Sequence, residues 1–178
     1  MTPRLATLAL GANMDSQAGA PPATLAAAIT RLQQVGVLHA LSSLWLTPPV
    51  GFTEQPWFHN AVLQIATDWE PERILAKLHR LEAEFGRDRT RTVRNGPRPL
   101  DLDLLLVGDR ILETPQLVLP HPRMTERAFV MLPLAEIAPE LRHPVTLRSV
   151  AEDLAALPES ERLACIRKPM PWDVSMKA

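Results

Sequence analysis

Two aspartates interrupt what otherwise reads as a buried β-strand in the segment RNGPRPLDLDLLLVG, residues 94–108. Apolar side chains fill the other strand positions: Leu100, Leu102, Leu104, Leu105, Leu106 and Val107. Because residues i and i+2 of a strand project from one face, Asp101 and Asp103 point the same way, about 7 Å apart. Two like charges at this separation resist ionising together unless a cation lies between them. The spacing therefore predicts a divalent metal ion at Asp101 and Asp103.

A basic loop precedes this strand. The segment GRDRTRTVRNGPRP carries five arginines: Arg87, Arg89, Arg91, Arg94 and Arg98. A guanidinium group donates two parallel hydrogen bonds to a phosphate, and the turn at Gly96-Pro97 can aim Arg98 at the aspartates. Arginines and a metal ion around a polyphosphate are the usual charge-neutralising groups of phosphoryl transfer. The alternative is a solvated basic loop neutralised by nearby acids, which the adjoining D-x-D strand disfavours.

The D-x-D pattern has other readings. It also occurs in sugar transferases, in nucleotidyl transferases and at solvated strand edges, so another magnesium-dependent transferase is an alternative. No G-x-x-x-x-G-K-[ST] segment is present, which excludes a Walker-type phosphate loop. A second polar segment, LPHPRMTERAF, adds His121, Arg123, Arg127 and Phe129. Trp57 and Phe58 flank an apolar strand, where packing in the core is the simpler interpretation.

Composition limits the class of protein. The chain has 178 residues and a formal net charge of -1, which predicts one domain without a global attraction to nucleic acid or anionic membranes. Cys165 is the only cysteine, so an intramolecular disulfide is excluded and the residue is interpreted as incidental. No apolar run approaches the ~20 residues of a membrane span, and RLATLALGAN is better read as a first strand than as a signal peptide. We expect a cytoplasmic protein.

Hydrophobic periodicity and breakers predict a mixed α+β order. The expected strands cover residues 5–10, 37–49, 60–66 and 100–107, with a short strand at 110–112 pairing back on the last of these. The expected helices cover residues 23–34, 71–86, 130–137 and 147–157. This β-α-β-β-α-β order predicts a ferredoxin-like antiparallel sheet with packed helices in three α/β/α layers. Residues 1–160 are expected to form a single domain, followed by a loose C-terminal tail at 161–178.

Four segments together resemble the 6-hydroxymethyl-7,8-dihydropterin pyrophosphokinase family: GPRPLDLDLLL, LALGANM, LTPPVGFTEQPWFHNAV and LVLPHPRMTERAFVMLPLAEIAPEL. In order and spacing they cover roughly residues 5–141. The resemblance implies a ferredoxin-like enzyme of folate biosynthesis that transfers pyrophosphate from ATP to the pterin alcohol, giving AMP and the pterin diphosphate. It implies two small-molecule substrates, ATP and hydroxymethyldihydropterin. We expect a monomer with neither nucleic acid nor membrane as a partner, and no fused second folate enzyme.

The resemblance also implies roles for individual residues. Asp101 and Asp103 would hold two Mg²⁺ ions against the ATP phosphates, and Arg87 and Arg98 would contact the phosphates during transfer. The implied nucleotide contacts are His79, Glu82, Arg89, Arg94, Leu104, His121 and Arg127. The implied pterin pocket consists of Thr47, Pro48, Pro49, Val50, Phe58, Asn60 and Phe129. In that pocket the two phenylalanines would stack on the ring and the asparagine would hydrogen-bond its edge.

The implied reaction is direct attack of the pterin hydroxymethyl oxygen on the β-phosphorus of ATP, with AMP leaving and no protein nucleophile. Loops at residues 11–22, 48–56 and 87–97 would close over the substrates. The chain departs from the family pattern at Asn95 and Pro122, where a tryptophan and a tyrosine are frequent, and at Gln116. An inactive nucleotide- or pterin-binding protein is the alternative from another class, which the intact Arg98, Asp101 and Asp103 disfavour.

Overall fold

The computed structural model describes residues 3–88, 90, 95–169 and 172. Its strands are β1 (Arg4–Ala12), β2 (Val37–Leu41), β3 (Leu44–Thr47), β4 (Phe58–Thr67), β5 (Asp101–Val107), β6 (Leu112–Glu113), β7 (Val118–Leu119) and β8 (Ile166–Lys168). Its α-helices are α1 (Pro21–Leu32), α2 (Pro71–Glu84), α3 (Ala128–Ile137), α4 (Val150–Ala156) and α5 (Glu159–Leu163), and a 3-10 turn, η1, spans Met124–Glu126. None of the helices in these ranges is long and apolar enough to cross a membrane.

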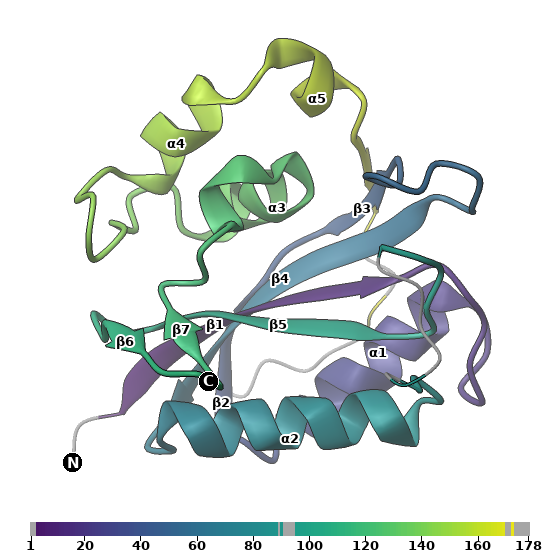
Figure 1. Ribbon diagram of the computed structural model, residues 1–178, viewed down its shortest axis with the longest axis horizontal. Coiled ribbons are helices and arrows are strands. Elements are labelled where there is room, and N and C mark those ends of the chain that lie inside the picture. The colour runs from purple at the N-terminus through teal and green to yellow at the C-terminus, as the bar shows by residue number, and fades with distance from the viewer. Residues whose placement is uncertain (1–2, 89, 91–94, 170–171, 173–178) are drawn as a thin grey trace.

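A single antiparallel sheet organises the molecule. Its strands follow the order β5-β1-β4-β3-β8, and β2 pairs with β4 beside β3. In Figure 1, α1 and α2 lie below the sheet, and α3, α4 and α5 lie above it. Separate apolar clusters fill the two interfaces, one against each face of the sheet. The predicted α+β class, with an antiparallel sheet and packed helices, is confirmed, and so is the three-layer arrangement.

The helices form where apolar spacing and start signals coincide. Prolines open α1 and α2, where a backbone N–H would have no partner within the helix. On α2 the side chains of Ile74, Leu78 and Leu81 follow helical spacing and are fully buried against the sheet. Helix α4 begins at a reciprocal cap, in which the Ser149 hydroxyl accepts from the Glu152 N–H and the Glu152 carboxylate accepts from the Ser149 N–H.

Strand β5 alternates as its sequence predicted. Leu102 and Leu104 face the cluster shared with α1 and α2, whereas Asp101 and Asp103 are partly exposed on the opposite face. The alternation ends at a register shift between β1 and β5, where Leu105 and Leu106 both join the second cluster. The paired aspartates therefore lie on the sheet face that α3 partly covers.

Two predicted strands need correction. The strand expected over residues 37–49 is two strands, because one extra residue at Ser42-Ser43 shifts the register against β4 between Leu41 and Trp45. The Ser42 hydroxyl accepts from the Val62 N–H at 3.0 Å, so the break is fixed inside the protein. The short strand predicted at residues 110–112 is β6, and it pairs with β7 instead of returning to β5.

The C-terminal segment is not wholly loose. Residues Ile166–Lys168 form β8, which pairs with β3 at the edge of the sheet. The side chain of Trp172 is buried in the cluster between the sheet and helices α1 and α2. The proposed boundary at residue 160 remains a prediction, but the described part of the segment after it takes part in the fold.

Candidate active site

A cavity of about 910 Å³ opens between the sheet and the helices above it. Strands β1, β3, β4 and β5 supply its floor, and the segments around α3 and α5 supply the opposite wall. Two groups of its lining residues differ in character. We call Thr47, Pro48, Pro49, Val50, Phe58, Asn60 and Phe129 the neutral half. We call Arg87, Arg98, Asp101, Asp103 and Arg127 the charged half. All of these residues were predicted from the sequence, and the fold brings them to one cavity.

The register of the sheet sets the distance between the two halves. Gly11 of β1 lies opposite Asp101 on one side and Asn60 on the other. These two side chains are therefore separated by two strand spacings, about 10 Å. A Cβ atom at Gly11 would lie 2.7 Å from the Asn60 Oδ1 atom, so only glycine leaves room between them. The bare backbone of Gly11 keeps the floor of the cavity open.

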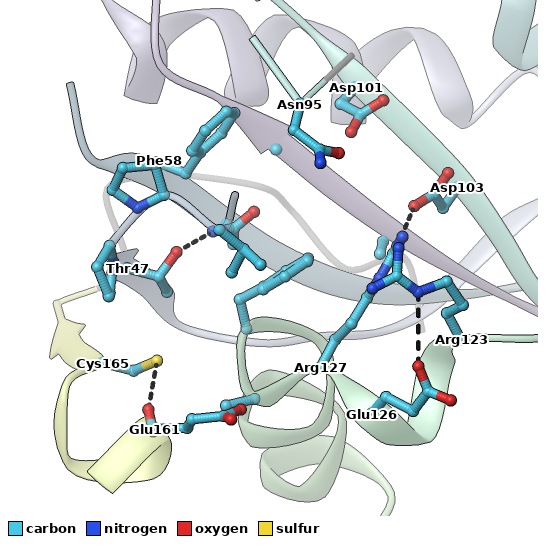
Figure 2. Close-up of a pocket in the computed structure, with 18 of the residues that line it drawn as sticks. Thr47, Phe58, Asn95, Asp101, Asp103, Arg123, Glu126, Arg127, Glu161 and Cys165 are labelled. Atoms are coloured by element: carbon cyan, nitrogen blue, oxygen red, sulfur yellow. Dashed lines mark hydrogen bonds and ion pairs between the residues drawn. The ribbon is translucent and has the colours of Figure 1, made fainter. Parts of the chain in front are cut away.

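A buried hydrogen bond fixes the neutral half. The Asn60 Nδ2 atom donates to the Thr47 hydroxyl at 2.7 Å, and both residues are almost fully buried. This bond orients the Asn60 amide near the start of β4, where the pairing with β3 already holds the backbone. Figure 2 shows the Thr47 side chain on the same side of the cavity as Phe58. The neutral half is thus a rigid polar edge beside aromatic and proline surfaces.

In the charged half, arginines and aspartates neutralise each other as ion pairs. The Arg98 guanidinium donates to the Asp101 carboxylate at 2.7 Å, and Arg127 donates to Asp103 at 3.2 Å. The carboxylates keep access to the cavity, since the Asp101 and Asp103 side chains are 21% and 32% exposed. Each aspartate thus has an arginine as an ion-pair partner, and the divalent metal ion expected between them remains a prediction. Figure 2 shows the Asp103 carboxylate turned toward Arg127.

Arg87 has a second, deeper anchor. Its guanidinium bridges Asp101 and Glu82, and the Glu82 side chain is only 1% exposed. The Glu82 carboxylate also accepts from the Leu102 N–H at 2.8 Å, which ties it to β5. Burial disfavours the charged form of Arg87, but the charges of Asp101 and Glu82 outweigh this and raise its pKa above the ordinary value. Arg87 is thus held both by the buried Glu82 and by Asp101, which lines the cavity.

Two arginines connect the halves. The Arg98 guanidinium lies over the Phe58 ring, 5.1 Å from its centroid, and the Arg127 guanidinium lies over the Phe129 ring at 5.5 Å. Both distances are within the range of cation–π attraction. Each of these arginines therefore contacts one aspartate of the charged half and one ring of the neutral half.

Asn13, which the sequence analysis did not single out, joins three loops. Its Nδ2 atom donates to the Gln55 side chain and to the Pro56 carbonyl, both at 2.9 Å. Its Oδ1 atom accepts from the Arg98 N–H at 2.8 Å. The Gln55 amide in turn donates to the Asn95 carbonyl at 2.7 Å. The loop after β1, the loop before β4 and the turn before β5 thus meet at one buried side chain, which positions the Arg98 backbone.

Some predicted nucleotide contacts lie away from the cavity. His79 is exposed on α2, Leu104 is buried in the core and Glu82 lies beneath Arg87. His121 is not among the lining residues, and burial lowers its pKa despite the opposing charge of Asp103. Arg89 and Arg94 fall outside the described residues. The roles of all these residues as nucleotide contacts remain predictions.

The sequence analysis missed one wall of the cavity. Ser160, Glu161, Ala164 and Cys165 line it from α5 and the residues that follow. Cys165, which the sequence analysis interpreted as incidental, is thus one of the residues that line the cavity. Burial raises the pKa of its thiol to about 11, and the thiol donates to the Glu161 carbonyl at 3.4 Å. A polar five-residue helix carries no pattern that marks it as a cavity wall, so nothing in the sequence indicated this one.

The donor set suits magnesium better than a metal that requires a protein cage. Within the described residues, no group of three or more His, Cys, Asp or Glu side chains is placed to hold a metal ion. Mg²⁺ is ordinarily held by one or two carboxylates together with substrate phosphates and water. Asp101 and Asp103, neighbours on one face of β5 and open to the cavity, fit that pattern.

Comparison with known proteins identifies similarity to one family of enzymes. The family model described as "7,8-dihydro-6-hydroxymethylpterin-pyrophosphokinase (HPPK)" matches residues 7–139. The chain is 42% identical over 151 residues to the 2-amino-4-hydroxy-6-hydroxymethyldihydropteridine pyrophosphokinase of Pseudomonas aeruginosa, covering 85% of this chain and 90% of that protein. It is 40% identical over 144 residues to the protein of the same name in Bacillus subtilis, covering 80% and 83%.

Two similar proteins are much longer. The folic acid synthesis protein fol1 of Pneumocystis carinii is 42% identical over 110 residues, which are 62% of this chain but 15% of that protein. A crystal structure of Plasmodium falciparum HPPK-DHPS has the same fold over 93% of this chain and 46% of its own, with a TM-score of 0.69 at 15% identity. This chain thus spans less than half of either protein, and nothing beyond the matched parts carries over.

Proposed function

Since the chain belongs to the 7,8-dihydro-6-hydroxymethylpterin-pyrophosphokinase family, we propose that its cavity performs the family reaction. The chain transfers pyrophosphate from ATP to 6-hydroxymethyl-7,8-dihydropterin, giving AMP and the pterin diphosphate of folate biosynthesis. The observation that carries this assignment is one cavity lined by two carboxylates in its charged half and two aromatic rings in its neutral half.

The neutral half would take the pterin. Phe58 and Phe129 supply aromatic surfaces for a flat heterocycle, and the oriented Asn60 amide supplies hydrogen bonds to its edge. Because the sheet register sets about 10 Å between Asn60 and Asp101, a ring bound at Asn60 can direct its substituent toward the charged half. The neutral half would thereby place the hydroxymethyl oxygen next to the phosphates.

The charged half would take the triphosphate. Asp101 and Asp103 would hold two Mg²⁺ ions, which when bound neutralise phosphate charge and orient the phosphates. Arg87, Arg98 and Arg127 would donate to the phosphate oxygens. The hydroxymethyl oxygen then attacks the β-phosphorus, its bond to that phosphorus forms, and the bond from the β-phosphorus to the oxygen carried by AMP breaks. The proton of the hydroxyl leaves to solvent.

Substrate binding must then exchange partners in the charged half. Arg98 pairs with Asp101 and Arg127 pairs with Asp103 in this structure, so metal ions at the aspartates would compete with these guanidinium groups. The arriving phosphates offer them new partners of the same charge. Arg87 differs, because Glu82 holds it in place whether or not Asp101 changes partner. We propose that Arg98 and Arg127 move onto phosphate and that Arg87 stays anchored.

The direct test is product analysis. Purified protein is mixed with ATP, magnesium and hydroxymethyldihydropterin, and the nucleotide products are separated by chromatography. The proposal expects AMP and the pterin diphosphate in equal amounts, and no AMP when the pterin is omitted. ADP with a pterin monophosphate would identify an ordinary kinase, and orthophosphate independent of pterin would identify an ATPase; either result contradicts the proposal.

A further inference from the structure

Glu136 of α3 lies outside both halves of the cavity, yet its carboxylate holds the start of β3. One oxygen accepts from the Ser43 N–H at 3.0 Å and from the Ser43 hydroxyl at 2.6 Å. The other oxygen accepts from the Trp45 indole N–H at 3.1 Å. Burial disfavours the ionised carboxylate, but the hydrogen bonds from Ser43, Trp45 and Arg167 outweigh it and lower the pKa of Glu136. The side chain is therefore charged at neutral pH.

The same carboxylate also holds β8. The Arg167 guanidinium donates to Glu136 at 2.8 Å and, through its Nε atom, to the Ser43 hydroxyl at 3.1 Å. Strand β8 is a three-residue edge strand whose side chains are exposed, and among the described strands it pairs with β3. So short an edge strand has few contacts of its own. Glu136 thus connects α3, β3 and β8 at one point.

These two strands lead directly into the neutral half. Strand β3 ends at Thr47, the hydroxyl that orients Asn60, and β8 begins one residue after Cys165. Leu46 pairs with Ile166, so Thr47 and Cys165 are the next residues outward at the same end of the two strands. Both line the cavity, and Figure 2 shows them on the same side of it. A shift of β8 against β3 would therefore change this wall.

We propose that Glu136 is a positioning residue for the pterin substrate, because it locks β3 to β8 and so sets the cavity wall made by Thr47 and Cys165. The inference rests on the proposed function for the identity of the substrate. The wall borders the neutral half and not the charged half, so the effect falls on the pterin and spares ATP. A merely structural role of Glu136 would affect both substrates alike.

Glu136→Gln is the sharpest substitution. Ser43, Trp45 and Arg167 all present donors, and a glutamine offers a single acceptor oxygen with an NH₂ group in place of the other. The size of the side chain is kept while at least one donor loses its acceptor. Arg167→Gln releases β8 but leaves the bonds from Glu136 to β3. Glu140→Gln, an exposed position just after α3, is the control with the same change of charge.

Two measurements report on the wall. Initial rates give KM for the pterin at saturating ATP and magnesium, and KM for ATP at saturating pterin. Independently, the rate at which Cys165 reacts with an aromatic disulfide, dithiobisnitrobenzoate, gives its accessibility, because it is the only thiol in the sequence. The thiolate attacks the reagent's disulfide, forms a mixed disulfide and releases a coloured thiolate. This second readout needs no turnover.

We expect Glu136→Gln to raise the pterin KM about fivefold or more while the ATP KM and kcat change less than about twofold. Cys165 should react faster in both Glu136→Gln and Arg167→Gln than in Glu140→Gln, and bound pterin should slow the reaction in the wild type. Equal rises in both KM values, or labelling rates equal to that of the control, would overturn the proposal. If Glu136→Gln does not fold, unchanged labelling of Arg167→Gln overturns it. Wild-type protein that binds pterin but makes no AMP would contradict only the proposed function.

Discussion

The two halves of the cavity are held together by different interactions. In the neutral half, a buried hydrogen bond from Asn60 to Thr47 and the pairing of β3 with β4 hold the lining in place without any ion. In the charged half, the guanidinium groups of Arg87, Arg98 and Arg127 satisfy the carboxylates of Glu82, Asp101 and Asp103. In the proposed function, the pterin would bind the neutral half without displacing an ion pair. Under the proposed function, the charged half would exchange some of its internal ion pairs for metal and phosphate.

The aspartates should give the largest effect. Asp101→Ala or Asp103→Ala removes a carboxylate that would hold magnesium, and we expect kcat to fall by about a thousandfold. The fold should persist, because both side chains point into the cavity and not into the core. Steady-state rates and thermal melting check this, with the exposed Asp109→Ala as the control. A near-normal magnesium-dependent rate in either variant would remove the basis of the charged half.

Arg98 should act mainly on the rate. If it meets the phosphates fully only as they react, Arg98→Ala should lower kcat about a hundredfold and weaken a non-hydrolysable ATP analogue less than about fivefold. Arg110→Ala serves as the control, since the Arg110 side chain is 41% exposed and, among the described residues, forms an ion pair with Glu70. Single-turnover kinetics measures the loss of rate, and calorimetry measures the loss of affinity for the ATP analogue. A loss of binding as large as the loss of rate would make Arg98 a ground-state anchor.

Arg87 should differ from Arg98 by affecting stability as well. Its guanidinium balances the charge of Glu82, whose side chain is 1% exposed, so Arg87→Ala should lower the free energy of unfolding by about 1–3 kcal/mol. Arg98→Ala should change it much less, because Asp101 is open to the cavity. Urea unfolding of the two variants measures the difference. Equal stabilities of the two variants would mean that the ion pair with Glu82 does not hold Arg87 more firmly than Arg98 is held. The proposal that Arg87 stays in place while Arg98 moves onto phosphate would then fail.

The neutral half should show smaller and more selective losses. Asn60→Ala and Phe129→Ala remove a hydrogen bond and a stacking surface, each expected to weaken pterin binding about fivefold. Binding of the ATP analogue should stay unchanged, and Trp57→Ala, an exposed aromatic beside β4, is the control. Fluorescence titration with the pterin and calorimetry with the analogue make the comparison. Equal losses for both ligands would place the pterin elsewhere.

Local periodicity predicted the parts of the site that follow from one strand or one helix. Alternation along β5 placed Asp101 and Asp103 on one face, and apolar spacing on α2 identified Ile74, Leu78 and Leu81 as its buried side. The resemblance to a family added the residues of the neutral half, and all of them line the cavity. These successes share a cause, since each depends on a pattern within a short segment.

What the sequence did not predict depends on contacts between distant segments. The pairing of Arg98 and Arg127 with the aspartates, the anchor of Arg87 on Glu82 and the network around Asn13 all join residues from separate elements. The pattern of apolar residues did not reveal the extra residue at Ser42-Ser43. The break depends on a hydrogen bond from the Val62 N–H of β4 to the Ser42 hydroxyl, which joins two separate segments. The wall at Cys165 arises only because β8 returns to the edge of the sheet.

Calorimetric titration of the wild-type protein tests the exchange in the charged half most directly. Magnesium alone, a non-hydrolysable ATP analogue alone and the two together are each titrated into the protein. The exchange predicts that magnesium alone gives no saturable heat at millimolar concentration, since Arg98 and Arg127 would lose their partners without gaining others. Saturating analogue should tighten magnesium binding about a hundredfold or more. Magnesium that binds the free protein as tightly as it binds the analogue complex would contradict the exchange.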